Sequence, residues 1–189
     1  SSEYLALWDG ATFLSCLSSE TAEEVWKNQI PGSPGVDLTA CGKAESIIFI
    51  SGNGVMGLRP DGSESFRLFG NFRKAHVFEN GKLLFLSVDG KAHFYLNSNH
   101  FSHIIPLDND IESMAAFGTG AFLISRDSVF SVNQDGAITG QSSFSSQVSS
   151  RNLMPEQAQL FIATLAGDLK LLNEAGEVVK TAAQVVKEA

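Results

Sequence analysis

The sequence predicts an all-β fold made of about five similar units, each containing four short strands. Three observations predict it. Short apolar runs recur along all 189 residues, glycine-containing turns separate them at a regular spacing, and no long helical pattern intervenes. The content of 43% hydrophobic and 18% charged residues is that of an ordinary globular chain, and a chain of this size can fold as one domain without disulfide staples.

Two turn markers repeat with the same period in every unit. The first falls at Gly10, Gly54, Gly90, Asp127 and Gly167, and the second falls near Ser19, Gly62, Ser98, Gly136 and Gly176. Both series have a period of about 40 residues. Four strands per period with glycine-rich turns are typical of the blade of a β-propeller, where sheets pack face to face around an axis because one sheet cannot bury both faces alone.

Each unit is expected to contain strands A, B, C and D in chain order, all within a single domain. The units are expected over residues 3–35, 36–74, 75–110, 111–147 and 148–189. Their A strands are expected within GVDLTA (35–40), KAHVF (74–78), IESMAAF (111–117) and SSRNLM (149–154). The first unit starts with YLALW (4–8), which is a B strand, so this unit lacks its own A strand.

The C-terminal segment is a candidate for the missing strand. QVVKEA (184–189) would pair with the first unit and close a ring of five blades. AAQVVKEA (182–189) is also rich in good helix formers, so a helical tail is an alternative. A third alternative is that the units form part of a larger propeller.

The segment GNGVMG (52–57) matches the G-x-G-x-x-G pattern of dinucleotide-binding loops. Such a loop needs a helix after the glycines, so that the helix N-terminus faces the phosphates. Here Pro60 and the pair Asp61-Gly62 break any helix within one turn. We therefore interpret the segment as a β-hairpin with Asn53-Gly54 at the centre of a type I′ turn.

Charge and composition limit the partners. With 13 basic and 21 acidic residues the net charge is −8, which argues against nucleic acid or an anionic membrane as the main partner. No apolar run is long enough for a membrane span, and no signal peptide is visible, which favours the cytoplasm unless a leader was removed. Cys16 and Cys41 are expected to be buried thiols. The chain is expected to be a monomer or part of a larger complex.

Candidate catalytic and metal sites are weak. His93, His100 and His103 cluster, but a spacing of three places His100 and His103 on opposite faces of a strand. Residues 108–112 contain three acids but lack the alternating ligands and the turn glycine of a calcium loop. The acids Asp9, Asp89, Asp127 and Asp168 recur at equivalent turns, which turn geometry explains. We predict no catalytic residue, no metal and no cofactor, and we favour a protein that is not an enzyme.

The first unit resembles the repeats of pyrroloquinoline-quinone-like propellers. The shared features are Asp9-Gly10, two short strands, a turn at 19–24 and Trp26, and the resemblance implies that this tryptophan packs between blades. VWKNQIPGSPG (25–35) is also faintly similar to tectonin repeats, which would imply sugar or lipid-headgroup binding. The combined signature of WD40 repeats, a Gly-His pair followed by a Trp-Asp pair, is absent. Resemblance to the β-propeller superfamily implies a binding platform more often than an enzyme.

The predicted function is a non-catalytic interaction or scaffold module that binds a protein or peptide. In propellers the B–C turns and the D–A connections share one face, and loops on a rigid scaffold often bind partners. The candidate binding residues on this face are Trp8, Asp9, Asn53, Arg73, Lys74, Asp89, Arg126, Asp127 and Asp168. Trp8 packed between the first two blades is the alternative for that residue. The alternative functions are a lectin-like or small-ligand-binding propeller and a five-bladed hydrolase with acids in the central channel.

Overall fold

The fold is almost entirely β, as predicted. The structure is a computed structural model that describes residues 4–8, 13–18, 20–29, 37–40, 47–51, 54–59, 61–97 and 100–182. Within these ranges the single helix is the short 3-10 helix η1 (Pro155–Gln157), and the remaining elements are strands. Among the described residues, no helix approaches the length and apolarity needed to cross a bilayer.

The described strands form five antiparallel sheets in chain order. The first sheet contains β1 (Tyr4–Trp8), β2 (Phe13–Ser18) and β3 (Glu24–Gln29). The second sheet contains β4 (Asp37–Ala40), β5 (Ile47–Ser51), β6 (Gly54–Leu58) and β7 (Glu64–Phe69). The third sheet contains β8 (Phe72–Val77), β9 (Leu83–Ser87), β10 (Ala92–Asn97) and β11 (His100–Ile104). The fourth sheet contains β12 (Ser113–Phe117), β13 (Gly120–Ile124), β14 (Ser128–Asn133) and β15 (Ile138–Ser143). The fifth sheet contains β16 (Val148–Met154), β17 (Gln159–Thr164), β18 (Leu169–Leu172) and β19 (Val178–Ala182). Four sheets thus have strands A to D, and the first has three described strands.

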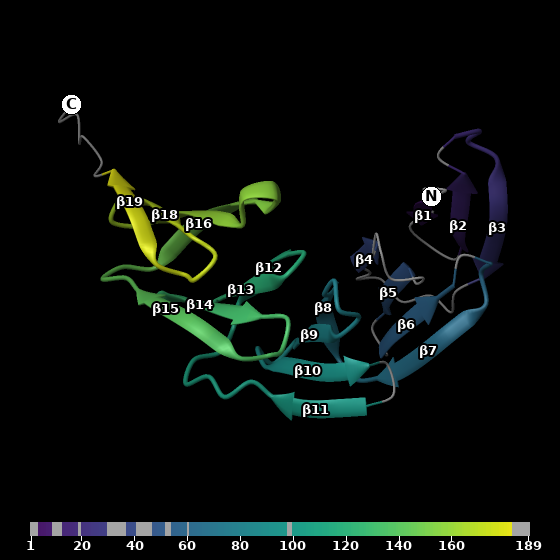
Figure 1. The fold of residues 1–189 in the computed structure, drawn as a ribbon, viewed down its shortest axis with the longest axis horizontal. Coiled ribbons are helices and arrows are strands. Elements are labelled where there is room, and N and C mark those ends of the chain that lie inside the picture. Colours follow the sequence, from purple (N-terminus) through teal and green to yellow (C-terminus); the bar gives the residue numbers. More distant parts are fainter. Residues whose placement is uncertain are drawn as a thin grey trace.

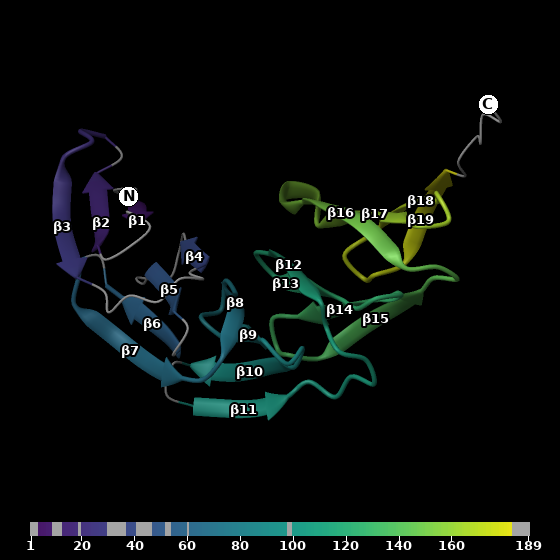
Figure 2. The same ribbon diagram turned by 180° about the vertical axis from the view of Figure 1, so that it is seen from behind.

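The sheets are arranged as the blades of an arc. In each four-stranded sheet the A strand lies on the inner side of the arc and the D strand on the outer side (Figure 1). The first and the fifth sheets lie at the two ends of this arc, as the view from behind also shows (Figure 2). Residues 183–189, which include the whole of the expected closing strand (184–189), lie outside the described residues.

The core lies between neighbouring sheets because strand side chains alternate between two faces. On β9, Leu84 and Leu86 belong to a buried cluster with Leu123 and Phe130 of the fourth sheet. Phe85 of the same strand belongs instead to a cluster that includes residues of the second sheet. We call the side of a sheet that faces the next sheet along the chain its forward face, and the other side its back face.

Glycine in the left-handed region closes most of the described turns. In six of these turns the glycine amide donates to the carbonyl three residues earlier, which makes a three-residue hairpin loop with a glycine bulge. These glycines have φ between 75° and 87°, and they are Gly62, Gly81, Gly90, Gly136, Gly167 and Gly176. Five of the six are among the turn markers that set the predicted period.

The strands β5 and β6 form a hairpin, but its register differs from the prediction by one residue. Ser51 of β5 pairs with Gly54, which is the first residue of β6, so Gly54 lies in a strand and not at the centre of the turn. Gly54 has a φ of 154°, which is not the value of a type I′ turn residue. Gly57 lies in β6 directly opposite Phe66, whose ring occupies the space that a side chain at 57 would need. Both glycines therefore have packing reasons unrelated to phosphate binding.

Candidate functional site

The B–C turns and the D–A connections meet on one side of the arc, which we call the loop face. In the third sheet, the amide of Val88 donates to the carbonyl of Asn71 (2.8 Å), and the amide of Ile111 donates to the carbonyl of Gly90 (2.9 Å). The turn between β9 and β10 therefore contacts the connection before it and the connection after it. In the fifth sheet, the amide of Leu165 likewise donates to the carbonyl of Gln147 (2.8 Å).

A buried hydroxyl lies at the end of the B strand in the third, fourth and fifth sheets, at this face. Ser87, Ser125 and Thr164 are all buried, and each hydrogen-bonds within its own B–C turn. Ser87 Oγ donates to the carbonyl of Lys91 (3.0 Å), and Ser125 Oγ donates to the carbonyl of Ser128 (3.2 Å). These bonds fix the turns, so the side chains that follow are presented from a rigid base.

The three described candidate aspartates lie in these turns. Asp89 and Asp127 are exposed, whereas Asp168 is half-buried. A hydrogen bond from Ser87 lowers the pKa of Asp89, so its carboxylate is ionised at neutral pH. The backbone carbonyl of Asp127 accepts from the amide of Phe144 (2.8 Å), which ties the turn to the next connection.

The candidate cations have structural contacts. Arg73 is half-buried on β8 and its guanidinium donates to the carbonyl of Ile111, which lies in the next connection. Arg126 is exposed, and with the Gln147 amide oriented so that its oxygen faces it, Arg126 donates to that oxygen through Nε and Nη. Lys74 is exposed on β8. Arg73 therefore links the third sheet to the connection that leads into the fourth sheet. Of these two arginines, Arg126 is the exposed one.

The structure gives little on three candidate residues near the first two sheets. Asp9 and Asn53 lie outside the described residues, and of Trp8 the structure gives the strand pairing with Leu14. The other tryptophan, Trp26 on β3, lies against the second sheet: a side chain added at Gly62 would come within 2.9 Å of its indole. A tryptophan between two sheets is the arrangement that the resemblance of the first unit implied.

Large apolar side chains on the loop face are exposed, and sequence reasoning missed them. Phe69 at the end of β7 is 82% exposed, and Val88 and Leu165 are 62% and 66% exposed. Val88 and Leu165 occupy the same position, directly after the buried hydroxyl, and Arg126 occupies it in the fourth sheet. The detectable signal was a bulky residue at a turn position where small polar residues are usual.

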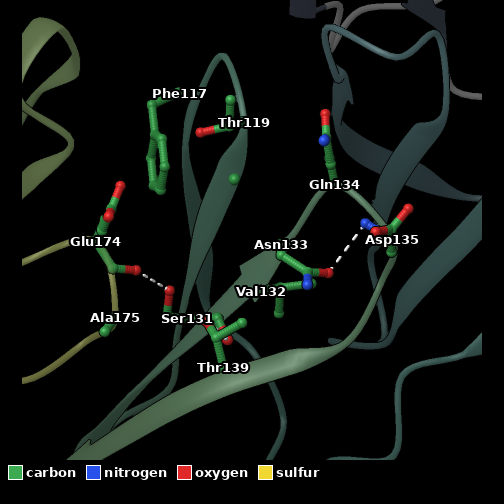
Figure 3. A pocket seen from close by; sticks show the side chains of 11 residues that line it. Phe117, Thr119, Ser131, Val132, Asn133, Gln134, Asp135, Thr139, Glu174 and Ala175 are labelled. Carbon is green, nitrogen blue, oxygen red and sulfur yellow. Dashed lines mark hydrogen bonds between the residues drawn. The ribbon is translucent and has the colours of Figure 1, made fainter.

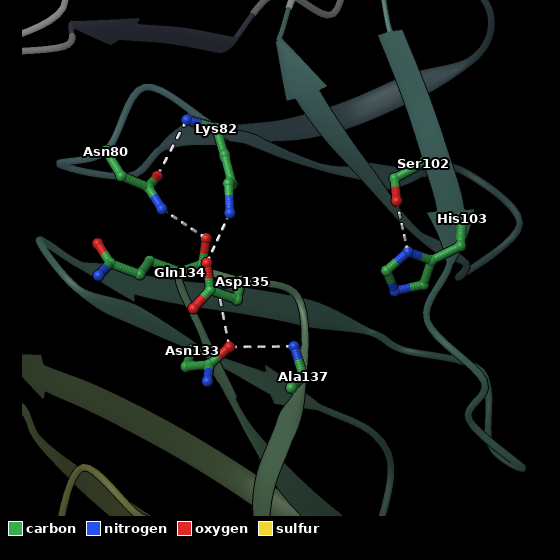
Figure 4. A network of polar contacts seen from close by, with 8 residues as sticks. All are labelled: Asn80, Lys82, Ser102, His103, Asn133, Gln134, Asp135 and Ala137. Atoms are coloured by element: carbon green, nitrogen blue, oxygen red, sulfur yellow. Dashed lines mark hydrogen bonds and ion pairs between the residues drawn. The ribbon is translucent and has the colours of Figure 1, made fainter.

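On the opposite side of the arc, polar side chains connect neighbouring sheets. Lys82, between β8 and β9, forms an ion pair with Asp135 of the fourth sheet (2.6 Å), and Asn80 donates to the carbonyl of Gln134 (3.0 Å) (Figure 4). Asn133 accepts from the amides of Asp135 and Ala137 and thereby holds this turn in place. These polar groups join the third and fourth sheets.

Two cavities that are lined by described residues lie between neighbouring sheets. One, of about 340 Å³, lies between the fourth and fifth sheets and is bounded by Phe117, Asp135 and Glu174, among others (Figure 3). The other, of about 300 Å³, lies between the first two sheets and is lined partly by Asn28 and Arg67. Their linings differ, so they are not copies of one pocket repeated around the arc.

The described inner strands contain one acidic residue, Asp37 of β4. The strands β8, β12 and β16 contain neither Asp nor Glu. On β8, burial lowers the pKa of His76, whose ring stacks edge-on against Phe78. In the described part of the chain, no group of three His, Cys, Asp or Glu side chains is placed to hold a metal ion.

Cys16 is a buried free thiol, and Cys41 lies outside the described residues.

Comparison with known proteins identifies the fold and no closer relationship. No family model matches the sequence, and no curated protein is similar to it. Solved structures that resemble it include BBS1N in complex with ARL6DN (TM-score 0.65, 12% identity), Kluyveromyces lactis Hsv2 (0.70, 12%) and BamB from Moraxella catarrhalis (0.63, 14%). The matches cover 96%, 92% and 96% of this chain but 64%, 58% and 61% of those chains, respectively. These proteins are β-propellers, and the chain has the same fold, with five blades.

Proposed function

We propose that the chain is a non-catalytic interaction module that binds a partner protein on its loop face. The observation that carries the proposal is the exposure of Phe69, Val88 and Leu165 on this one face. Burying a Val, Leu or Phe side chain stabilises a complex by roughly 1.5–3 kcal/mol. An apolar set on a rigid rim is therefore a suitable anchor for a protein surface.

Arg126 adds a polar anchor between the apolar ones. It occupies in the fourth sheet the position that Val88 and Leu165 occupy in the third and fifth sheets. Arginine is enriched at binding hot spots because its planar group can hydrogen-bond and stack at the same time. Its contact with Gln147 holds the guanidinium near the turn, so little side-chain entropy is lost on binding.

The charges around these anchors favour a partner with a basic rim. Five exposed acids surround the third and fourth blades on this side, namely Asp89, Asp108, Asp110, Glu112 and Asp127. Exposed bases at the same turns are Lys91 and Arg126. An excess of acids accelerates association with a basic surface, and that acceleration weakens with salt. We therefore expect the association rate to fall as ionic strength rises.

The alternatives receive less support. A lectin-like propeller would carry equivalent pockets in several blades, whereas the two cavities have different linings. A hydrolase of this fold would bring acids together on the inner strands, whereas the described inner strands contain one acid, Asp37 of β4. The finer resemblance of the first repeat to pyrroloquinoline-quinone-like propellers is supported by the contact of Trp26 with the second sheet, and it assigns no ligand.

Site-specific photo-crosslinking tests the proposal. p-Benzoylphenylalanine is placed at Val88 or Leu165, and at Ile138 as the control, because Ile138 is exposed and apolar but lies on the outer strand β15. We expect Val88 and Leu165 to give the same protein adduct in cells and Ile138 to give none. Adducts from Ile138 alone, or none from any position, would contradict binding at the loop face.

A further inference from the structure

On the side opposite the loop face, an aromatic ring and an ion pair fill the interface between the third and fourth sheets. The ring of Phe94 lies 6.2 Å from that of Phe78, measured between centroids, and a Cβ added at Gly136 would come within 2.7 Å of it. Lys82 reaches from the third sheet to the carboxylate of Asp135 (2.6 Å) (Figure 4). The side chains of these two sheets therefore close the interface themselves.

The lysine has no equivalent at the next interface, between the fourth and fifth sheets. Lys82 lies five residues before the buried Ser87, and the residue five before the buried Ser125 is Gly120. A Cβ at position 120 would come within 2.6 Å of the ring of Phe117, so this ring leaves no room for a lysine there.

The aromatic ring is also missing from the second interface. Phe94 pairs with Leu84 of its B strand, and the equivalent pair in the fourth sheet is Ser131 with Phe122. Ser131 is buried, and its hydroxyl donates to the backbone carbonyl of Glu174 in the fifth sheet. A small polar residue thus stands where the preceding sheet has a phenylalanine.

The aspartate of the ion pair is replaced as well. The C–D turn of the fourth sheet reads Asn-Gln-Asp-Gly (133–136), and that of the fifth sheet reads Asn-Glu-Ala-Gly (173–176). Ala175 therefore occupies the position of Asp135, and Glu174 brings a carboxylate to the position before it.

The cavity of about 340 Å³ between the fourth and fifth sheets follows from these three replacements. It is lined by the small residues Gly120, Ser131 and Ala175, and Phe117 and Glu174 border it as well (Figure 3). The cavity is thus the space that lysine, phenylalanine and aspartate side chains fill at the preceding interface.

The charge of the cavity is negative. Among the described residues that line it, Asp135 and Glu174 are acids and none is a base. The carboxylate of Asp135 pairs with Lys82, whereas no cation pairs with the carboxylate of Glu174 in the described part of the chain. An acid without a counter-charge therefore stands beside a cavity that has an aromatic wall.

We propose that this cavity binds a primary ammonium group carried on an apolar stem. The ammonium would meet the carboxylate of Glu174, as Lys82 meets Asp135 at the preceding interface. The stem would pack against Phe117, and an aromatic ring also attracts a cation. A largely preformed pocket with an apolar wall and few polar groups is typical of ligand sites. A lysine side chain of another protein and a free small amine both present this chemistry.

The cavity does not depend on what lies beyond the fifth sheet. Both sheets that enclose it are described, and at the preceding interface two adjoining sheets fill the equivalent space. A sheet that followed the fifth would cover its forward face, where Phe161 is 41% exposed, and not this interface. Because the cavity lies on the side opposite the loop face, the inference does not rest on the proposed function.

An NMR titration with n-butylammonium, the analogue of a lysine side chain, tests the inference. Amide chemical shifts of Thr119, Gly120 and Ala175 report on the cavity, and 1-butanol is the neutral control of the same length. We expect saturable shifts at these amides with n-butylammonium, and binding of 1-butanol that is at least about tenfold weaker, because Glu174 can pair only with the cation.

Two neighbouring acids provide the matched variants. Glu174→Gln should weaken binding of n-butylammonium at least about tenfold, because it removes the charge and keeps the shape of the side chain. Glu177→Gln should leave the affinity within about twofold, since Glu177 lies on the same hairpin, accepts a hydrogen bond from Asn173 (2.9 Å) and is not among the lining residues.

A blocked Gly-Gly-Lys-Gly-Gly peptide distinguishes the two sources of the ammonium group. Binding at least as tight as that of n-butylammonium would identify a lysine side chain, and weaker binding would identify a free amine. The inference is overturned by the absence of saturable shifts, by equal affinity for 1-butanol, or by equal effects of Glu174→Gln and Glu177→Gln. Each of these failures would leave loop-face binding untouched, because crosslinking from Val88 and Leu165 measures that separately.

Discussion

Replacing Gly54 with alanine tests the hairpin interpretation of the glycine motif. A Cβ at this position would lie 2.0 Å from the carbonyl oxygen of Leu68 and 3.2 Å from the Cα of Phe69. Both belong to the backbone of β7, so no side-chain rotation can relieve the overlap. The φ of 154° adds strain, because residues other than glycine rarely adopt it.

The expected cost follows from these two effects. Backbone strain of this kind costs about 1–3 kcal/mol, and overpacking that shifts a backbone costs about 1–3 kcal/mol more. We therefore expect Gly54→Ala to lower the free energy of unfolding by about 3 kcal/mol or more. Gly81→Ala is the control: Gly81 has a φ of 80° but no atom within 4 Å of its Cβ position, so only the conformational cost of about 1–2 kcal/mol applies.

Urea unfolding and thermal melts measure the difference. For a chain of this size 1 kcal/mol corresponds to roughly 2–4 °C in Tm, so Gly54→Ala should lower Tm clearly more than Gly81→Ala does. Equal losses in the two variants would refute the packing argument. Titration with NAD or ATP completes the test, because saturable binding that disappears in Gly54→Ala would restore the phosphate-loop interpretation of the motif.

The remaining predictions concern the contacts that hold the sheets together. Burial lowers the pKa of His76 below its usual 6.5, so the unfolded chain binds more protons than the folded chain does. The free energy of unfolding should therefore fall as pH decreases below about 6.5. The urea midpoints at pH 7.5 and pH 5.5 should differ less in His76→Gln than in the wild type. A double-mutant cycle with Lys82→Met and Asp135→Asn should give a coupling of about 0.2–1 kcal/mol that decreases with salt; zero coupling at low salt would contradict the ion pair. Leu172→Ala should cost about 2–5 kcal/mol in urea unfolding, because Leu172 is fully buried between the fourth and fifth sheets, and a cost below 1 kcal/mol would contradict that packing.

Local turn chemistry explains why so much of the fold could be predicted. Gly62, Gly136 and Gly176 set the period because a left-handed turn position selects glycine, and strand alternation between turns is a local property. The A strand expected over 74–78 spans Phe72–Val77, and the strand expected over 111–117 spans Ser113–Phe117. Short strands bounded by such turns are visible in the sequence without knowledge of their neighbours.

What was missed depends on distant parts of the chain. The Asn53-Gly54 pair predicted a turn, but it did not determine the register of the hairpin, because Gly52-Asn53 is an equally suitable turn sequence. The pairing of Ser51 with Gly54 determines the register. Arg73 stays a predicted binding residue, but its hydrogen bond to the carbonyl of Ile111, 38 residues away, has no local signal in the sequence. The exposure of Phe161 depends on the absence of a following sheet among the described residues, which no local pattern reports.

Binding affinity at the loop face tests the central claim most directly. Once crosslinking has identified the partner, its Kd is measured by calorimetry for the wild type, Val88→Asp, Leu165→Asp and the control Ile138→Asp. The substitutions at Val88 and Leu165 should each raise Kd at least tenfold, which corresponds to about 1.4 kcal/mol, while Ile138→Asp should leave it within about twofold. An unchanged Kd for both loop-face variants, with folding intact by thermal melt, would contradict the assignment of the binding surface.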